Sequence, residues 1–254
     1  MTIWLFIAIA VLFFVTSAIG VVTGSNSLIT VPVMFQLGID EKVAIATNMF
    51  GLTFMAAGGS IPFLRAGKID LHKIWPLLVV TALGSALGAA LVGLISNEGL
   101  KLLVSAAMIV VAVFILFNIQ PSENTISASL KRPGLMIFLA FGLAIYGGLY
   151  SGGYVTVLTA MLVAFSAMHF GEAVGSTKLI NLVSSTVATI VFMYQGFVDL
   201  WLGSLLAVAM FSGAYAGAHF ASRMSETPLK WIFLSTVALL AIKTLYDVLA
   251  GSLI

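Results

Sequence analysis

The chain has 254 residues, of which 61% are hydrophobic and 8% are charged, and its net charge is +2. Its mean hydropathy is +1.17, whereas soluble domains carry roughly 25% charged residues. This composition excludes a soluble domain, and the small net charge argues against nucleic acid as a partner. The absence of cysteine excludes disulfides, thiolate metal sites and thiol catalysis. We therefore expect an all-α, polytopic integral membrane protein that lies in a lipid bilayer and needs no cofactor.

Apolar segments recur along the whole chain, and eight of them are long enough to cross a hydrocarbon core of ~30 Å, which takes about 20 residues. These eight predicted spans cover 3–22, 43–64, 74–95, 100–118, 134–151, 172–194, 201–222 and 229–249. Each half of the chain also has one short apolar run, 28–37 or 155–165, which follows a polar or glycine-containing break. The sequence thus predicts eight full spans plus two short broken or re-entrant helices.

The chain also resembles itself when it is shifted by 129 residues. Asp70 then meets Asp199 and Lys101 meets Lys230, although only 9 acidic and 11 basic residues exist to be matched. We interpret this as a duplication, with a first membrane repeat over 1–120, a linker over 121–133 and a second membrane repeat over 134–254. In a membrane protein, such a duplication is typical of a transporter whose substrate binds where the repeats meet.

The basic residues predict how the two repeats are oriented. If the short runs cross the membrane, one face carries seven basic residues and the other two, namely Arg65, Lys68, Lys73, Lys131, Arg132, Arg223 and Lys230 against Lys42 and Lys101. If each short run joins its preceding helix in one broken span, the split is five to four. The positive-inside rule favours the first arrangement. It inverts the second repeat, with the linker in the cytoplasm and both termini outside.

Two breaks precede the short runs, one from Thr23 to Ser27 and the other from Ser151 to Tyr154. The candidate site residues within them are Gly24, Ser25, Asn26, Gly152 and Gly153. Unpaired backbone groups inside a bilayer are tolerated only where protein or a water-filled cavity covers them. The amides that start the following helix carry a partial positive charge, so each break is a candidate anion site. The alternative interpretation is a glycine hinge that lets helices pack closely.

Lys178 is the most informative single residue, because it lies about two turns inside a predicted span. A lysine at the centre of a membrane helix costs ~2.5–3.5 kcal/mol. None of the residues three or four positions away is acidic; they are Val174, Gly175, Asn181 and Leu182. Its natural partner is therefore a bound anion, a carbonyl group or water. The alternative is a snorkelling side chain whose ammonium reaches the interface.

Polar residues near Lys178 complete the candidate substrate site. Ser176 and Thr177 align with Thr47 and Asn48 of the first repeat, and Asn181 lies one turn beyond Lys178. We expect a small anionic solute to bind among these residues and the two breaks, and we leave open whether the protein forms a homodimer. The chain contains no HExxH, Walker A or G-x-S-x-G motif, so we do not expect an enzyme.

A function of another class is a retinal-type photoreceptor or light-driven pump, since an intramembrane lysine can form a Schiff base. Such a protein would need carboxylate counter-ions in mid-span and a single seven-helix bundle. No Asp or Glu falls in the middle of any predicted span. The duplicated breaks would also have no explanation in such a protein.

Several short motifs recur in order in both halves of the chain. They are Gly20 to Gly24 followed by Val31-Pro32, Ala44 to Asn48 and Gly67 to Asp70 in the first half, and Gly148 to Gly153, Glu172 to Lys178 and Gly196 to Asp199 in the second. Together they resemble the sulfite exporter TauE/SafE family of membrane transporters from about Leu5 to Leu249. The resemblance implies export of a small sulfur-containing anion, such as sulfite, a sulfonate or a sulfoacetate-like carboxylate, across a bacterial inner membrane. Where family members commonly carry a run of glycines, this chain has Ser25, Asn26 and Ser27.

Overall fold

The computed structural model describes residues 3–24, 26–117, 133–166 and 168–225, together with short pieces between 227 and 239. This part of the chain is all-α. Its helices are α1 (Ile3–Thr23), α2 (Ser27–Gln36), α3 (Glu41–Arg65), α4 (Leu71–Val92), α5 (Asn97–Phe117), α6 (Pro133–Leu149), α7 (Tyr154–Ser166), α8 (Phe170–Tyr194) and α9 (Leu200–Ala221). Four of them, α3, α4, α8 and α9, are long and apolar enough to cross a membrane. Residues 121–132 of the expected linker and most of the expected span 229–249 lie outside the described residues.

Aspartates begin three of these four long helices. Asp40 accepts hydrogen bonds from the amides of Lys42 and Val43, and thereby satisfies donors that the first turn of α3 leaves free. Asp70 caps α4 and Asp199 caps α9 in the same way. The two aspartates that coincide at the 129-residue shift therefore have the same structural role.

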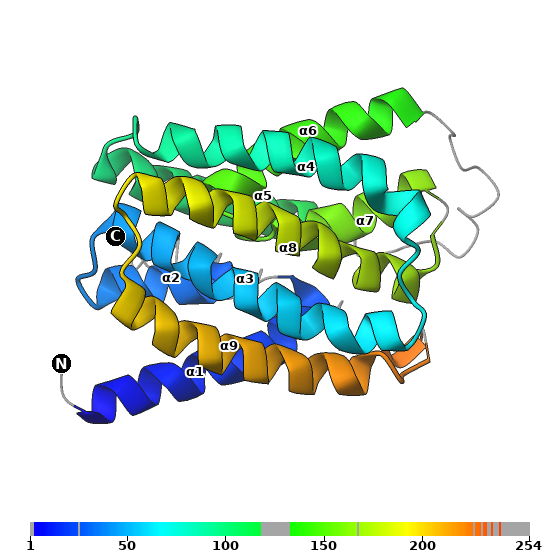
Figure 1. The fold of residues 1–254 in the computed structure, drawn as a ribbon, viewed down its shortest axis with the longest axis horizontal. Helices are drawn as coiled ribbons and strands as arrows, with labels where there is room; N and C mark the ends of the chain where they lie inside the picture. The colour runs from blue at the N-terminus through cyan, green and yellow to red at the C-terminus, as the bar shows by residue number, and fades with distance from the viewer. Residues whose placement is uncertain are drawn as a thin grey trace.

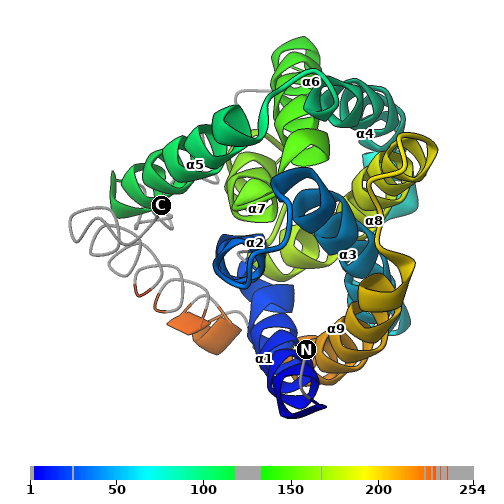
Figure 2. The same ribbon diagram turned by 90° about the vertical axis from the view of Figure 1, so that its left-hand side faces the viewer.

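Among the long helices, α3 packs against α8 (Figure 2). Helix α9 packs on α3, and α4 packs on α8. Helix α1 then lies along α9, and α6 lies along α4. Glycines permit both of these outer contacts. A Cβ on Gly217 would lie 2.0 Å from the carbonyl oxygen of Ala18, and one on Gly88 would lie 2.0 Å from that of Ile145. Only glycine allows backbones this close.

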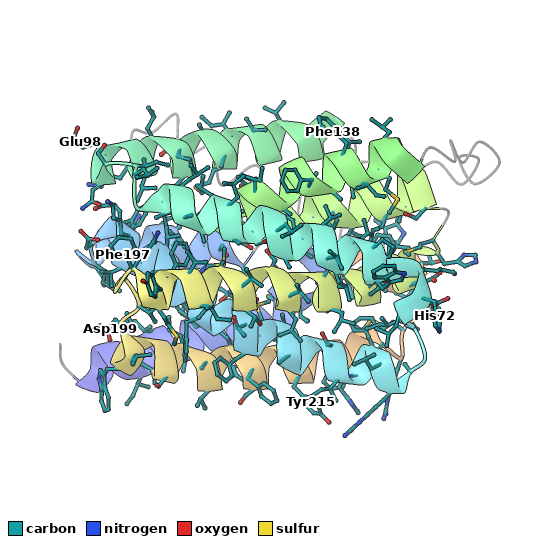
Figure 3. All side chains as sticks on the ribbon, turned by 45° about the horizontal axis from the view of Figure 1, so that its top comes forward. His72, Glu98, Phe138, Phe197, Asp199 and Tyr215 are labelled. Atoms are coloured by element: carbon teal, nitrogen blue, oxygen red, sulfur yellow. The ribbon has the colours of Figure 1, made fainter. Side chains whose placement is uncertain are left out.

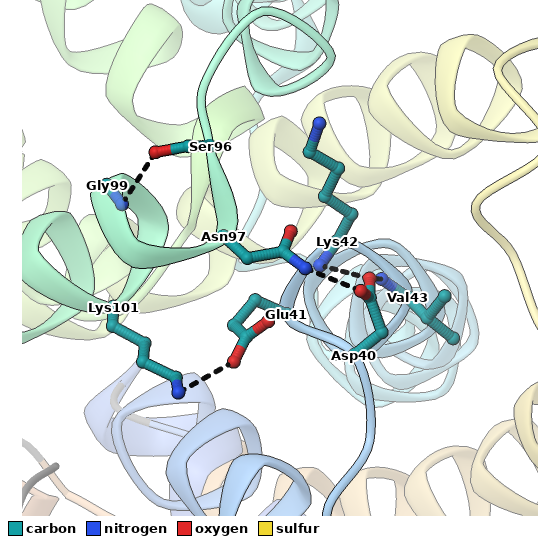
Figure 4. A network of polar contacts seen from close by, with 8 residues as sticks. All are labelled: Asp40, Glu41, Lys42, Val43, Ser96, Asn97, Gly99 and Lys101. Atoms are coloured by element: carbon teal, nitrogen blue, oxygen red, sulfur yellow. Dashed lines mark hydrogen bonds and ion pairs between the residues drawn. The ribbon is translucent and has the colours of Figure 1, made fainter.

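Opposite ends of the bundle carry different turns. We call one the Lys68 end; it holds the turns after α3 and α9 and the start of α8. There Lys68 donates to the Met224 carbonyl in the turn after α9, and Lys73 donates to Glu172 at the start of α8. The other, which we call the Lys42 end, holds the starts of α3, α5 and α9. There Asn97 donates to Asp40 and Lys101 pairs with Glu41 at 3.1 Å (Figure 4). At the same end, Lys42 donates to the Gly93 carbonyl.

The segments before the breaks differ from simple full spans. Helix α1 starts at the Lys42 end, and after the break α2 runs back to that same end (Figure 1). Helix α6 starts at the Lys68 end, and α7 returns there (Figure 1). Each pair is thus a hairpin inside the bundle, with an α6 of only 17 residues. A hairpin returns the chain to the end of the bundle from which it started, just as two complete crossings would. The described turns therefore keep the grouping of basic residues that was expected for crossing runs.

Candidate functional site

The two breaks meet each other inside the bundle. The Thr156 hydroxyl donates to the Thr23 carbonyl at 2.6 Å, and the Tyr150 hydroxyl donates to the Ser27 carbonyl at 3.1 Å. A Cβ added to Gly24 would lie 2.5 Å from the Cβ of Val155. The tips of the α1–α2 and α6–α7 hairpins are therefore in direct contact, although 129 residues separate their glycines.

Glycine provides the backbone angles at these tips. Gly24 has φ +74° and Gly153 has φ +75°, a region that side chains with a Cβ seldom occupy. Ser151 also has a positive φ, of 68°. The carbonyl of Gly152 is covered by the Tyr146 hydroxyl, which donates to it. The sequence-predicted breaks are thus genuine changes of chain direction, and local hydroxyl groups satisfy part of the backbone that they free.

A small cavity lies where the hairpin tips meet α3 and α8. Its volume is about 20 Å³, and a water molecule needs roughly 10–15 Å³. Its polar lining comes from Asn26, Ser27, Ser151, Lys178 and Asn181, and its apolar lining from Val21, Leu52, Met55, Ala56 and Val155. Gly20 and Gly24 complete the wall. In this conformation the cavity suits one or two waters, so it must widen to admit an oxyanion.

Lys178 provides the positive charge of this cavity. Its side chain is 4% exposed. Within the described part of the chain, Lys178 forms no ion pair, since the ion pairs there involve Lys73 and Lys101, and its ammonium forms no hydrogen bond. An ammonium removed from water without a counter-charge is strongly disfavoured. The arrangement favours an anion, which neutralises the ammonium and accepts its hydrogen bonds.

Two amide side chains beside Lys178 are also unsatisfied. Asn26 is 3% exposed, and neither its Oδ1 nor its Nδ2 has a hydrogen-bond partner. Asn181 is 7% exposed and its Oδ1 has no partner. Leaving a buried polar group unpaired costs ~1–3 kcal/mol. Three polar side chains that lack partners therefore line one cavity, and a polar ligand would satisfy several of them together.

Other predicted site residues lie outside the cavity lining. Asn48 donates to Ser27 Oγ at 2.9 Å and accepts from Thr30 Oγ1 at 2.7 Å, so it holds the start of α2. Thr47 Oγ1 accepts from the Asp199 amide at 3.0 Å, near the Lys42 end. In this conformation these two side chains stabilise neighbouring segments and do not line the cavity.

The predicted site residues next to Lys178 on α8 also do not line the cavity. Thr177 Oγ1 donates to the Val174 carbonyl at 2.8 Å within the helix. Ser176 Oγ is buried without a partner, but it does not line the cavity. Gly152 and Gly153 shape the second break without lining the cavity, and Ser25 lies outside the described residues. Of the predicted residues, the structure thus brings Gly24, Asn26, Lys178 and Asn181 together.

Sequence reasoning placed Ser27 and Ser151 in the breaks, but it named neither them nor Tyr150 and Thr156 as site residues. Ser27 and Ser151 line the cavity, and Tyr150 and Thr156 bind the two tips together. Ser27 aligns with Thr156 at the 129-residue shift, a signal that could have identified both. Tyr150 aligns with Val21, so nothing in the repeat pattern distinguishes it.

The two halves of the chain contribute residues of different polarity to the cavity. Lys178 aligns with Met49, and Asn181 aligns with Leu52, which lies in the wall of the same cavity. Helix α8 therefore contributes charge and hydrogen-bonding groups, whereas α3 contributes apolar surface. A solute in this position contacts a cationic side and an apolar side.

A family model for sulfite exporter TauE/SafE matches residues 8–244. The chain belongs to the TauE/SafE family. It is 25% identical to a probable membrane transporter protein of Haemophilus influenzae, over 94% of this chain and 95% of the relative. It is also 25% identical to the probable membrane transporter protein ORF9 of a Sinorhizobium species, over 92% and 90% of the two chains, and 24% identical to YdhB of Bacillus subtilis, over 82% and 86%. No solved structure matches it. This TauE/SafE member is accordingly a membrane transporter.

Proposed function

We propose that this protein transports a small oxyanion, either a sulfur-containing anion such as sulfite, a sulfonate or a sulfoacetate-like compound, or another small organic anion. The observation that carries the proposal is the buried Lys178 ammonium in the cavity where the two hairpin tips meet, because no carboxylate among the described residues pairs with it. The unpaired Asn26 and Asn181 amides lie in the same wall and supply further hydrogen bonds. Family membership supports transport, and the charge of the cavity supports an anion.

We further propose an inverted-repeat architecture in a bacterial inner membrane. The helix pairs support it, since α1 on α9 and α9 on α3 correspond to α6 on α4 and α4 on α8. The described basic residues support the orientation. Arg65, Lys68, Lys73 and Arg223 belong to the Lys68 end, against Lys42 and Lys101 at the other. By the positive-inside rule, the Lys68 end faces the cytoplasm.

Export of an anion in this orientation needs no further energy source. A single negative charge that leaves a negatively charged interior gains ~2.3 kcal/mol per 100 mV. A facilitated pathway is therefore sufficient for outward transport. No finding supports the retinal alternative, and the relatives named above are described as transporters.

The function is tested by ligand-induced stabilisation of the purified protein. We expect sulfite, thiosulfate, a short sulfonate or a small carboxylate to raise the unfolding temperature, because a ligand at 100 times its Kd stabilises the native state by ~2.7 kcal/mol. The same solute should leave proteoliposomes faster when a membrane potential is imposed. Absence of both effects across all these anions would contradict the proposal.

The topology is tested with single cysteines, because the natural chain contains none. His72 is exposed at the start of α4, and Trp201, which aligns with it at the 129-residue shift, is exposed at the start of α9. Figure 3 shows His72 and Asp199, the cap of α9, at opposite ends of the bundle. We expect Trp201→Cys to react with an impermeant thiol reagent in intact cells, and His72→Cys to react only after the cells are permeabilised. Labelling of both from the same side would refute the inverted arrangement.

A further inference from the structure

A second cavity opens at the Lys68 end, and we call it the vestibule. Its volume is about 540 Å³. Its wall includes Gly67 and Lys68 from the turn after α3, Gly171 and Glu172 from the start of α8, and Met224 and Ser225 from the turn after α9. The inner cavity around Lys178 lies deeper along α8. Seven residues separate Gly171 from Lys178, which corresponds to ~10 Å at 1.5 Å per residue.

The vestibule and the inner cavity adjoin the same face of α8. Gly171, Gly175 and Lys178 are four and three residues apart, so they lie above one another on that face. Gly171 lines the vestibule and Lys178 lines the inner cavity. Gly175 lies between them and has no side chain. The shortest connection between the two cavities therefore runs past Gly175.

Side chains from the end of α3 and from the turn after it close this connection. A Cβ on Gly175 would lie 3.2 Å from Phe63 Cδ1, 3.2 Å from Ile69 Cγ1 and 3.1 Å from the Lys68 carbonyl oxygen. Phe63 is completely buried. Phe63 and Ile69 thus fill the space between the vestibule and the Lys178 cavity, and we call this pair the plug.

The turn after α3 joins the two plug residues, with Phe63 in the last turns of that helix and Ile69 beyond its end. Its backbone reverses at Gly67, which has φ +66° and around which a Cβ would meet no atom within 4 Å. The Lys68 amide donates to the Phe63 carbonyl at 3.0 Å, so the turn links both plug residues. From the same turn, the Lys68 ammonium crosses the vestibule to the Met224 carbonyl at 3.4 Å.

The charged lining of the vestibule consists of the Lys68 ammonium and the carboxylates of Asp70 and Glu172. Glu172 is paired with Lys73 at 2.8 Å, and Asp70 caps α4 through the His72 amide. Among the described residues, no carboxylate pairs with Lys68. The ammonium of Lys68 is therefore available to an anion that reaches the vestibule.

We propose that solutes reach the Lys178 cavity from the Lys68 end, through the vestibule, when the plug of Phe63 and Ile69 swings away from Gly175. Lys68 is the first cation on this route. The role of Lys68 rests on the proposed anion transport, whereas the route and its plug do not. The plug separates the buried cavity from the vestibule in the present conformation.

The route is tested by the accessibility of a cysteine in the inner cavity. Ala56 lines that cavity and is 2% exposed, so Ala56→Cys in the cysteine-free chain reports entry. In detergent, where both ends are open to reagent, we expect Phe63→Ala to accelerate its reaction with a sulfonate-bearing methanethiosulfonate about tenfold, equivalent to ~1.4 kcal/mol in the opening equilibrium. Ile69→Ala, at a less buried position, should act in the same direction and provides a second variant if Phe63→Ala unfolds.

Phe192→Ala is the matched control. Phe192 is equally buried and aligns with Phe63 at the 129-residue shift. The turn after its helix has the same hydrogen bond as the turn after α3, because the Phe197 amide donates to the Phe192 carbonyl at 3.0 Å. We expect it to leave the labelling rate unchanged. Equal acceleration by Phe192→Ala, or none by either plug variant, would overturn the proposal.

The role of Lys68 is tested by changing the charge of the reagent. In the Phe63→Ala, Ala56→Cys background, Lys68→Gln should slow the sulfonate reagent several-fold and leave a trimethylammonium reagent unaffected. Equal effects on both reagents would refute an electrostatic role for Lys68. Because labelling needs no transported solute, a failed ligand screen with successful labelling would reject anion transport while retaining the route.

Discussion

Replacing Lys178 by methionine will weaken anion binding by about one to two orders of magnitude, because charge-assisted hydrogen bonds contribute ~1.5–3 kcal/mol each. Methionine preserves much of the side-chain length and removes the charge. The cavity then keeps the Asn26 and Asn181 amides but has no group that neutralises the solute. The measurement is the Kd of the stabilising anion, taken from the concentration dependence of its thermal shift.

Two further variants define what the Lys178 result means. Lys178→Arg keeps the charge but replaces a compact ammonium by a planar guanidinium, so we expect intermediate affinity. Lys101→Met removes an exposed lysine that pairs with Glu41 at the Lys42 end, and it should leave the Kd unchanged. If Lys178→Met binds and transports the anion as well as the parent protein does, the substrate site lies elsewhere.

Substituting alanine for Gly24 will abolish transport and strongly lower the stability of the folded protein. The first cause is backbone strain, since φ is +74° and a left-handed conformation costs a non-glycine residue ~1–2 kcal/mol. The second cause is collision, because the added Cβ would lie 2.5 Å from Val155 Cβ and 2.8 Å from the Thr156 amide nitrogen. The hairpin tips must then separate. Thermal unfolding in detergent and efflux from proteoliposomes measure the two effects.

Gly38→Ala separates strain from collision. Gly38 has nearly the same φ, +76°, but a Cβ there would meet no atom within 4 Å. We expect Gly38→Ala to lose only the ~1–2 kcal/mol of backbone strain and to retain efflux. If Gly24→Ala behaves like Gly38→Ala in both measurements, contact between the hairpin tips is not required for transport.

Several features of this protein could be predicted from the sequence because they depend on local physical chemistry. Helices built from about 20 apolar residues satisfy their own backbone hydrogen bonds, so composition alone indicates a membrane protein. Left-handed glycines act over one turn, and for that reason Gly24 and Gly153 reverse the chain at the breaks that the sequence predicted. The burial of Lys178 likewise follows from its place inside a long apolar segment.

The tertiary structure alone decided where the short helices go and which side chains face the cavity. A run of 10 residues, such as α2, has no sequence signal that distinguishes a crossing from a return, because its direction depends on packing against distant helices. The rotation of each helix about its axis is set in the same way. Packing turned Asn48 toward Ser27 and Thr30, and it brought Ser151 and Asn26 to Lys178, which lies on another helix. Contacts between segments more than 100 residues apart, such as that of Thr156 with Thr23, select one such arrangement.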